Sequence, residues 1–78
     1  MTFELVKEIL TTKGGLAPGP ITPDASLAGA GVDSMALVVL SLQLEDRLGL
    51  EISEDDLSTA ASVGGLAEMI SRHAERRV

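Results

Sequence analysis

The sequence predicts an all-α fold in one small domain, and three observations carry this prediction. The chain has 78 residues, 45% of them hydrophobic, which is enough for one modest core and too few for two domains. It has a single aromatic residue, Phe3, and no cysteine, so its core must be built from Leu, Val, Ile, Met and Ala, a composition that favours helices. Apolar residues also recur at helical spacing in three separate segments. We therefore expect residues 1–78 to form one helical domain.

The first predicted helix begins near Thr2, a candidate N-cap, and ends before the pair Gly14-Gly15. Its spacing places four apolar side chains on one face: Phe3, Val6, Ile9 and Leu10. This face is expected to pack into the core.

A long loop is predicted for residues 14–33, which contain three prolines and five glycines without a sustained apolar period. Loops of this length in a small domain are usually functional or anchored to the core. Ile21 and Leu27 are the candidate anchors, and residues 24–27 could form a capped turn that starts at Asp24.

The second predicted helix runs from about Ser34 to Leu48, with Asp33 or Ser34 as its N-cap and Gly49 at its end. Its apolar residues form two stripes. One stripe comprises Leu37, Leu40, Leu44 and Leu48, and the other comprises Met35, Val38, Val39 and Leu42. Either both stripes are core, as in a central helix, or the second stripe is left for a partner or an apolar cargo.

Two further helices follow. Residues 53–57 predict a one-turn helix capped by Ser53, with three acidic residues in its first turn. The last helix starts after Ser62 as N-cap, although Gly64-Gly65 weakens its start. Its apolar stripe comprises Val63, Leu66, Ala67, Ile70 and Ala74.

Charge narrows the classes of partner. The formal net charge of −6 argues against nucleic acid and anionic membrane, because both reward a basic surface. No basic leader and no membrane-spanning apolar segment is seen, so we expect a cytoplasmic protein. Positions 24–68 hold nine acidic residues against one basic residue, which serve either solubility or docking to basic partner surfaces.

Catalytic and metal-binding signals are weak. His73 is the only histidine and has no cysteine or clustered carboxylate at ligand spacing, so we expect no metal site. Ser34 has no base that the sequence can supply, which argues against a hydrolase triad. The sequence therefore predicts a protein that is not an enzyme.

The segment Gly31-Val32-Asp33-Ser34-Met35 combines a polar pair at a loop-to-helix junction with the apolar helix that follows. Taken alone, Asp-Ser in this position is an ordinary helix cap. Over nearly its whole length, however, the chain resembles the acyl carrier protein family. That family shares the small acidic domain, the Pro- and Gly-containing loop, an Asp-Ser-Leu or Asp-Ser-Met signature at the second helix, and the later short acidic helix.

The resemblance implies a right-handed four-helix bundle with three long helices, one short helix and a long loop between helices 1 and 2. It also implies a 4'-phosphopantetheine arm joined to the Ser34 hydroxyl by a phosphodiester and installed from coenzyme A by a phosphopantetheinyl transferase. Cargo would be held as a thioester on the arm. The other implied partners are acyl-loading and acyl-processing enzymes such as synthases or ligases, and we expect a monomer.

The resemblance also assigns a partner surface beside the serine. Asp33 and Met35 flank the attachment site. The implied docking residues are Val38, Val39, Leu42, Glu45, Asp46, Asp55 and Asp56.

One feature departs from the pattern of fatty-acid carriers, whose second helix tends to carry acids soon after the serine. Here no acid precedes Glu45, which favours a discrete carrier of polyketide, fatty-acid-like or related specialised biosynthesis. Two alternatives remain open. One is an aminoacyl or peptidyl carrier of a nonribosomal peptide-type pathway, against which Val32 before Asp33 counts mildly. The other is a helical interaction module in which Ser34 is only a cap.

Overall fold

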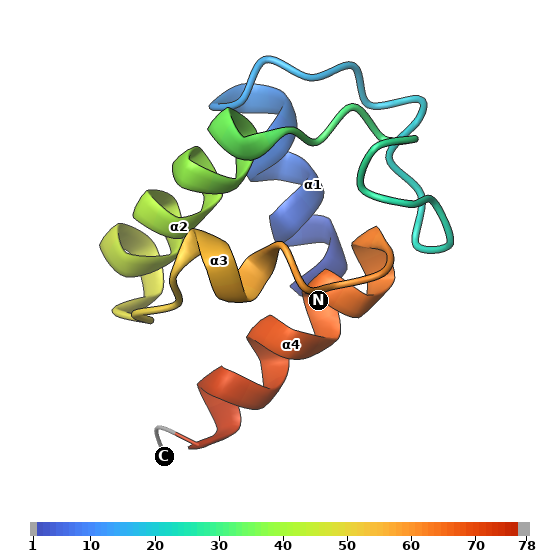
Figure 1. Ribbon diagram of the computed structural model, residues 1–78. Coiled ribbons are helices and arrows are strands. Elements are labelled where there is room, and N and C mark those ends of the chain that lie inside the picture. The colour runs from blue at the N-terminus through green and yellow to red at the C-terminus, as the bar shows by residue number, and fades with distance from the viewer. Residues whose placement is uncertain (1, 77–78) are drawn as a thin grey trace.

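The structure, a computed structural model, describes residues 2–76, and over that range it contains four α-helices and no strand (Figure 1). The helices are α1 (Thr2–Thr12), α2 (Ser34–Leu48), α3 (Glu54–Leu57) and α4 (Val63–Arg76). This arrangement confirms the all-α prediction. Residues 13–33 join α1 to α2 without helix or strand.

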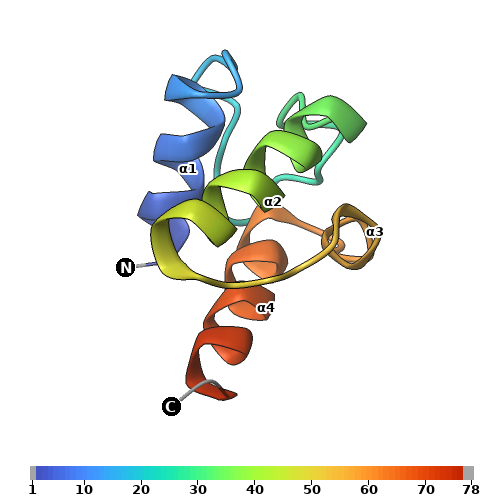
Figure 2. The ribbon, with the colours of Figure 1, turned by 90° about the vertical axis from the view of Figure 1, so that its left-hand side faces the viewer.

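The helices enclose one apolar core. α1 packs against both α2 and α4, and α2 also packs against α3 (Figure 2). The predicted inner face of α1 is confirmed for Val6, Ile9 and Leu10, which are completely buried, and the fourth member, Phe3, is partly buried against the core. No described side chain in the core is polar or charged, so burial of aliphatic surface is the main stabilising term.

The two stripes of α2 have different environments. Leu37, Leu40 and Leu44 are buried as predicted, whereas Met35 is 69% exposed and Leu42 is 60% exposed. Val38 and Val39 are partly buried. The second stripe is therefore not core, and α2 keeps an apolar side facing solvent.

The prediction that Leu48 belongs to the buried stripe is wrong, because its side chain is 45% exposed. The reason is the end of α2. Gly49 adopts the left-handed conformation (φ 67°), and its N–H and that of Leu50 donate to the carbonyls of Glu45 and Leu44 at 3.0 and 3.3 Å. The chain reverses there, and Leu50 occupies the core in place of Leu48.

The loop of residues 13–33 is anchored at more points than predicted. Ile21 is fully buried and Leu27 partly buried, in agreement with the prediction, and Ala30 and Val32 are buried as well. The predicted capped turn starts at Ser26 rather than at Asp24, because the Ser26 Oγ accepts from the Gly29 N–H at 3.0 Å.

The same loop closes the start of α4, where the two segments lie side by side (Figure 1). The N–H groups of Val63 and Gly64 donate to the carbonyls of Ala25 and Pro23 at 2.9 and 2.8 Å. A Cβ atom at Gly64 would lie 2.6 Å from the Pro23 carbonyl oxygen. Gly64 is therefore required by a close backbone approach, and describing it only as a weak point of the helix was wrong.

The predicted caps of the two later helices are confirmed. The Oγ atoms of Ser53 and Ser62 accept from the backbone N–H groups of Asp56 and Gly65 at 3.2 and 3.0 Å. The described part of α1 begins at Thr2, in agreement with the predicted start, and the Thr2 hydroxyl lies 2.7 Å from the Ser71 hydroxyl.

Ala74 was predicted to lie on the buried stripe of α4 and is exposed. Both views show why, since the last turns of α4 extend past the other helices (Figures 1 and 2). Val63, Leu66, Ala67 and Ile70 nearer its start are buried as predicted.

Candidate functional site

The start of α2 presents Ser34 to solvent, and the residues before it explain why. Gly31 has a positive φ of 84°, which turns the chain, and Val32 is buried with its N–H bonded to the Leu27 carbonyl at 2.8 Å. Asp33 is extended and Ser34 is the first residue of the helix. Val32 is thus anchored in the core, whereas Ser34, two residues later, is exposed.

Asp33 is the N-cap of α2, which settles the choice between Asp33 and Ser34. Its Oδ1 accepts from the Ala36 N–H at 2.9 Å, and its carbonyl accepts from the Leu37 N–H at 3.1 Å. The Ser34 hydroxyl makes no hydrogen bond to the other residues that the structure describes. The cap and the free hydroxyl are therefore supplied by two different residues.

The electrostatics of this helix start suit an anion. No acidic residue lies in the first turn of α2, whereas α3 carries three. A helix N-terminus has unpaired N–H groups and a partial positive charge, which favour a phosphate group. The exposed Ser34 hydroxyl at this position fits a phosphodiester-linked group.

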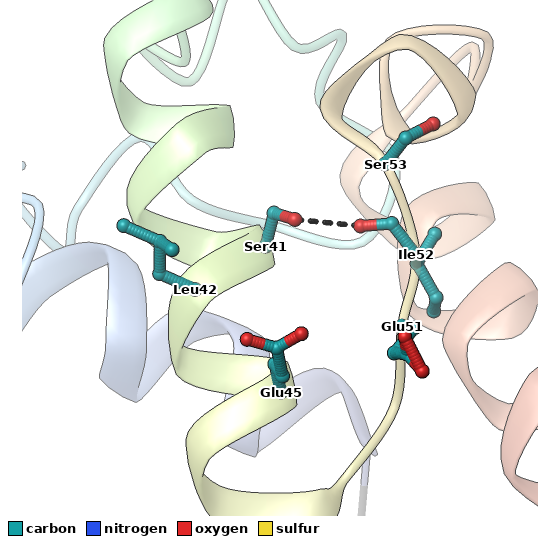
Figure 3. Close-up of a pocket in the computed structure, with 6 residues that line it drawn as sticks. All are labelled: Ser41, Leu42, Glu45, Glu51, Ile52 and Ser53. Carbon is teal, nitrogen blue, oxygen red and sulfur yellow. Dashed lines mark hydrogen bonds between the residues drawn. The ribbon is translucent and has the colours of Figure 1, made fainter.

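The face of α2 that continues from Ser34 borders two adjoining surface hollows of about 290 Å³ each. Residues 38, 41, 42 and 45 follow Ser34 at helical spacing and so share its face. The hollow nearer Ser34 is lined by Val38, Ser41, Leu42, Ser53, Glu54 and Asp55. The second is lined by Ser41, Leu42, Glu45, Glu51, Ile52 and Ser53 (Figure 3).

The structure brings together some of the residues predicted for docking and separates others. Val38, Leu42 and Asp55 line one hollow, and Leu42 and Glu45 line the other. The remaining predicted docking residues line neither: Val39, Asp46 and Asp56. All three are nevertheless at least partly solvent-accessible.

Ser41 is the residue of this region that the sequence did not single out. Its hydroxyl donates to the Ile52 carbonyl at 2.6 Å and joins α2 to the segment that leads into α3 (Figure 3). The signal available was that Ser41 is the only polar residue between Met35 and Leu42. A serine within an apolar helix often hydrogen-bonds to a backbone carbonyl.

Elsewhere in residues 2–76 the structure places no group of three or more His, Cys, Asp or Glu side chains that could hold a metal ion. His73 is partly buried on α4, away from Ser34 in sequence and in element. None of the described helices has both the length and the apolar character that crossing a membrane requires.

Comparison with known proteins identifies the family. Residues 4–70 match the family model described as the phosphopantetheine attachment site. Meromycolate extension acyl carrier proteins of Mycobacterium leprae, Mycobacterium bovis and Mycobacterium tuberculosis are each 31% identical over 71 residues. The match covers 90% of this chain and 62% of each relative, so the chain spans less than two thirds of their length.

Members of this family carry intermediates rather than catalyse their conversion, and they work with phosphopantetheinyl transferases and biosynthetic enzymes. On the family match over residues 4–70, the chain belongs to the acyl carrier protein family and contains the domain that holds a covalently attached 4'-phosphopantetheine group.

Proposed function

We propose that the chain acts as an acyl carrier whose 4'-phosphopantetheine arm is attached to Ser34. The observation that carries this proposal is the start of α2, where an exposed hydroxyl without a hydrogen-bond partner among residues 2–76 follows a capping aspartate and precedes a first turn without acids. The other serines that begin helices, Ser53 and Ser62, use their hydroxyls as caps. Ser34 is therefore the helix-start serine best suited to modification.

The residues around Ser34 have separate tasks in this function. Asp33 holds the first turn of α2 through its bond to the Ala36 N–H, which keeps Ser34 at a fixed place on the surface. The partial positive charge at this helix end stabilises the negative charge of the phosphodiester. The bound arm supplies a thiol, which this cysteine-free chain lacks, and holds acyl groups as thioesters.

Partner enzymes would dock on the exposed side of α2 and on α3, the surface formed by Val38, Val39, Leu42, Glu45, Asp46, Asp55 and Asp56. Residues 34–44 carry no charge, and Met35 and Leu42 are well exposed. Recognition next to Ser34 thus combines the Asp33 carboxylate with an apolar helix face, and the next charge on α2 is Glu45. The transferase and the acyl-loading and acyl-processing enzymes, such as synthases or ligases, would meet this surface.

Residues 1–78 act as one carrier domain with the right-handed four-helix bundle of the family, as a monomer in the cytoplasm. The names of the related mycobacterial proteins support work on extended acyl chains, and the uncharged start of α2 favours a specialised pathway, fatty-acid-like or polyketide.

Intact-mass spectrometry after incubation with coenzyme A and a broad-specificity phosphopantetheinyl transferase tests the attachment. The wild type is expected to gain the mass of one arm, and Ser34→Ala is expected to gain none. Ser58→Ala, which removes another exposed hydroxyl, is the matched control and should be modified like the wild type. Lack of modification in the wild type, or unchanged modification of Ser34→Ala, would refute the proposal.

The same measurement separates acyl from aminoacyl carriage. Arm-bearing protein offered to acyl-loading enzymes should gain an acyl mass, and offered to aminoacyl-activating enzymes should not. The reverse pattern would assign the chain to the aminoacyl or peptidyl carriers.

A further inference from the structure

Met35 is the large apolar side chain that α2 exposes most. It is 69% exposed, compared with 60% for Leu42 and 45% for Leu48, and it directly follows Ser34 in the first turn of the helix. Met69, the other methionine among residues 2–76, is partly buried against the core on α4. The two thioethers therefore differ in their access to solvent, and the more accessible one lies next to the serine proposed to carry the arm.

The composition of the chain directs oxidation to methionine. The sequence contains no cysteine, tryptophan or tyrosine, so its three methionines hold the only sulfur atoms before an arm is attached. Peroxides convert the methionine thioether to a polar sulfoxide, and sulfoxide reductases restore it. An exposed sulfur reacts faster with a dissolved oxidant than a buried one, because no neighbouring atoms shield it. Met35 is therefore expected to react before Met69.

The start of α2 can accommodate the sulfoxide. Neither the Ser34 nor the Met35 N–H is bonded to another residue in the range 2–76, and the first turn contains no acid. A sulfoxide oxygen carries partial negative charge, which the partial positive charge of a helix start stabilises. The same oxygen binds water strongly, so burying it against a partner costs free energy. Oxidation thus preserves the helix and changes the surface beside Ser34.

We infer that Met35 is an oxidation site through which hydrogen peroxide slows installation of the arm at Ser34. In the reaction the O–O bond of the peroxide breaks, one oxygen atom bonds to the Met35 sulfur, and the other leaves as water with both hydrogen atoms. The sulfur is oxidised and the peroxide reduced by the same electron pair. The effect on installation rests on the proposed function, because it requires a transferase that docks beside Ser34.

Limited treatment of the arm-free protein with hydrogen peroxide identifies the oxidised residue. Trypsin places the methionines on separate peptides, because a lysine or arginine lies between each methionine and the next. Mass spectrometry of these peptides is expected to show Met35 gaining oxygen about fivefold faster than Met69 in the folded chain. Unfolding in urea should remove the difference, since both sulfur atoms are then exposed. Oxidation of Met69 as fast as Met35 in the folded chain would overturn the inference.

Installation kinetics measure the consequence of oxidation. After the peroxide has been removed, the oxidised wild type is expected to accept the arm with a kcat/KM about threefold below that of the untreated protein, because part of the apolar contact is lost. Treatment with a methionine sulfoxide reductase and a dithiol should restore the rate. An unchanged kcat/KM for protein oxidised at Met35 would overturn the inference.

Two leucine variants assign the effect to one methionine. Met35→Leu keeps an apolar side chain without an oxidisable sulfur, so its rates before and after peroxide should be equal, whatever the starting rate. Met69→Leu should keep the slowing seen in the wild type. Slowing that persists in Met35→Leu would contradict the inference. Failure of the untreated wild type to accept the arm would instead refute the proposed function, and the peptide analysis, which needs no transferase, would still rank the two methionines.

Discussion

The starts of α2 and α4 show how two similar helix beginnings take on different roles. At α4 all four first-turn N–H groups have protein partners. Those of Val63 and Gly64 bond to loop carbonyls, and those of Gly65 and Leu66 bond to the side chain and carbonyl of Ser62. The backbone N–H groups that could bind an anion at the start of α4 are therefore already hydrogen-bonded.

At α2 only the third and fourth residues, Ala36 and Leu37, have their N–H groups bonded to Asp33. No bond joins the N–H groups of Ser34 or Met35 to another residue in the range 2–76. A helix start thus keeps unbonded N–H donors and an exposed serine hydroxyl when another residue caps the helix and no loop covers it.

The largest effect on stability is expected from a substitution at the start of α4, where the loop of residues 13–33 packs closely against the helix. Gly64→Ala should lower the free energy of unfolding by on the order of 2 kcal/mol, because its Cβ would lie 2.6 Å from the Pro23 carbonyl oxygen. Urea unfolding measures it. Gly65→Ala is the control, since its Cβ would meet only the Ser62 Oγ at 3.4 Å, and it should be neutral or stabilising. Equal effects of both substitutions would contradict the close approach.

A substitution can place an acidic residue in the first turn of α2, where α3 has three and α2 has none. Met35→Asp should slow arm installation about tenfold, because a negative charge then repels the incoming phosphate. The same charge should slightly raise stability through the helix dipole. Met35→Gln, polar but uncharged, is the control for loss of the apolar side chain. Equal rates for Asp and Gln would show that charge at this position does not matter.

Removal of the Asp33 cap tests whether helix capping by Asp33 and arm attachment at Ser34 are separate roles. Asp33→Ala should lower the free energy of unfolding by about 1 kcal/mol, because the Ala36 N–H loses its partner. Asp33→Asn keeps an acceptor oxygen and should stay near the wild type. Thermal or urea unfolding of the two variants measures the difference, and a destabilised Asn variant would show that charge rather than capping is what counts.

The smallest effect is expected at α3. Asp55→Asn together with Asp56→Asn should slow arm installation about threefold and make it less sensitive to salt, since these acids are exposed and screened. Rates at low and high salt provide the measurement. Rates identical to the wild type at low and at high salt would show that these two acids serve solubility rather than docking.

Sequence reasoning succeeded where the signal was local. Periodicity placed Val6, Ile9 and Leu10 in the core, and capping chemistry placed Ser53 and Ser62 at helix starts. Both depend on residues within a turn or two of one another. The order of helices and the position of Ser34 follow from the same kind of signal.

The failures involve tertiary contacts. Leu48 and Ala74 fit the spacing of buried stripes but lie where a helix ends or extends past its neighbours. The Ser41 hydroxyl donates to a carbonyl eleven residues away, on the segment that leads into α3. No periodicity encodes which loop carbonyl meets which helix start, so the role of Gly64 was not predictable either.

The two hydrogen bonds between the loop of residues 13–33 and the start of α4 also affect when the protein can fold during its synthesis. They join residues 23 and 25 to residues 64 and 63, so α2 and α3 lie inside a ring of backbone that only α4 can close. Closing a ring of this size carries an entropic cost that must be met before its contacts form. Because synthesis proceeds from the N-terminus, these two contacts of the loop that leads to Ser34 can form only after α4 has been made. A chain cut short before α4 would still contain Ser34 but would lack these two contacts of the loop that precedes it.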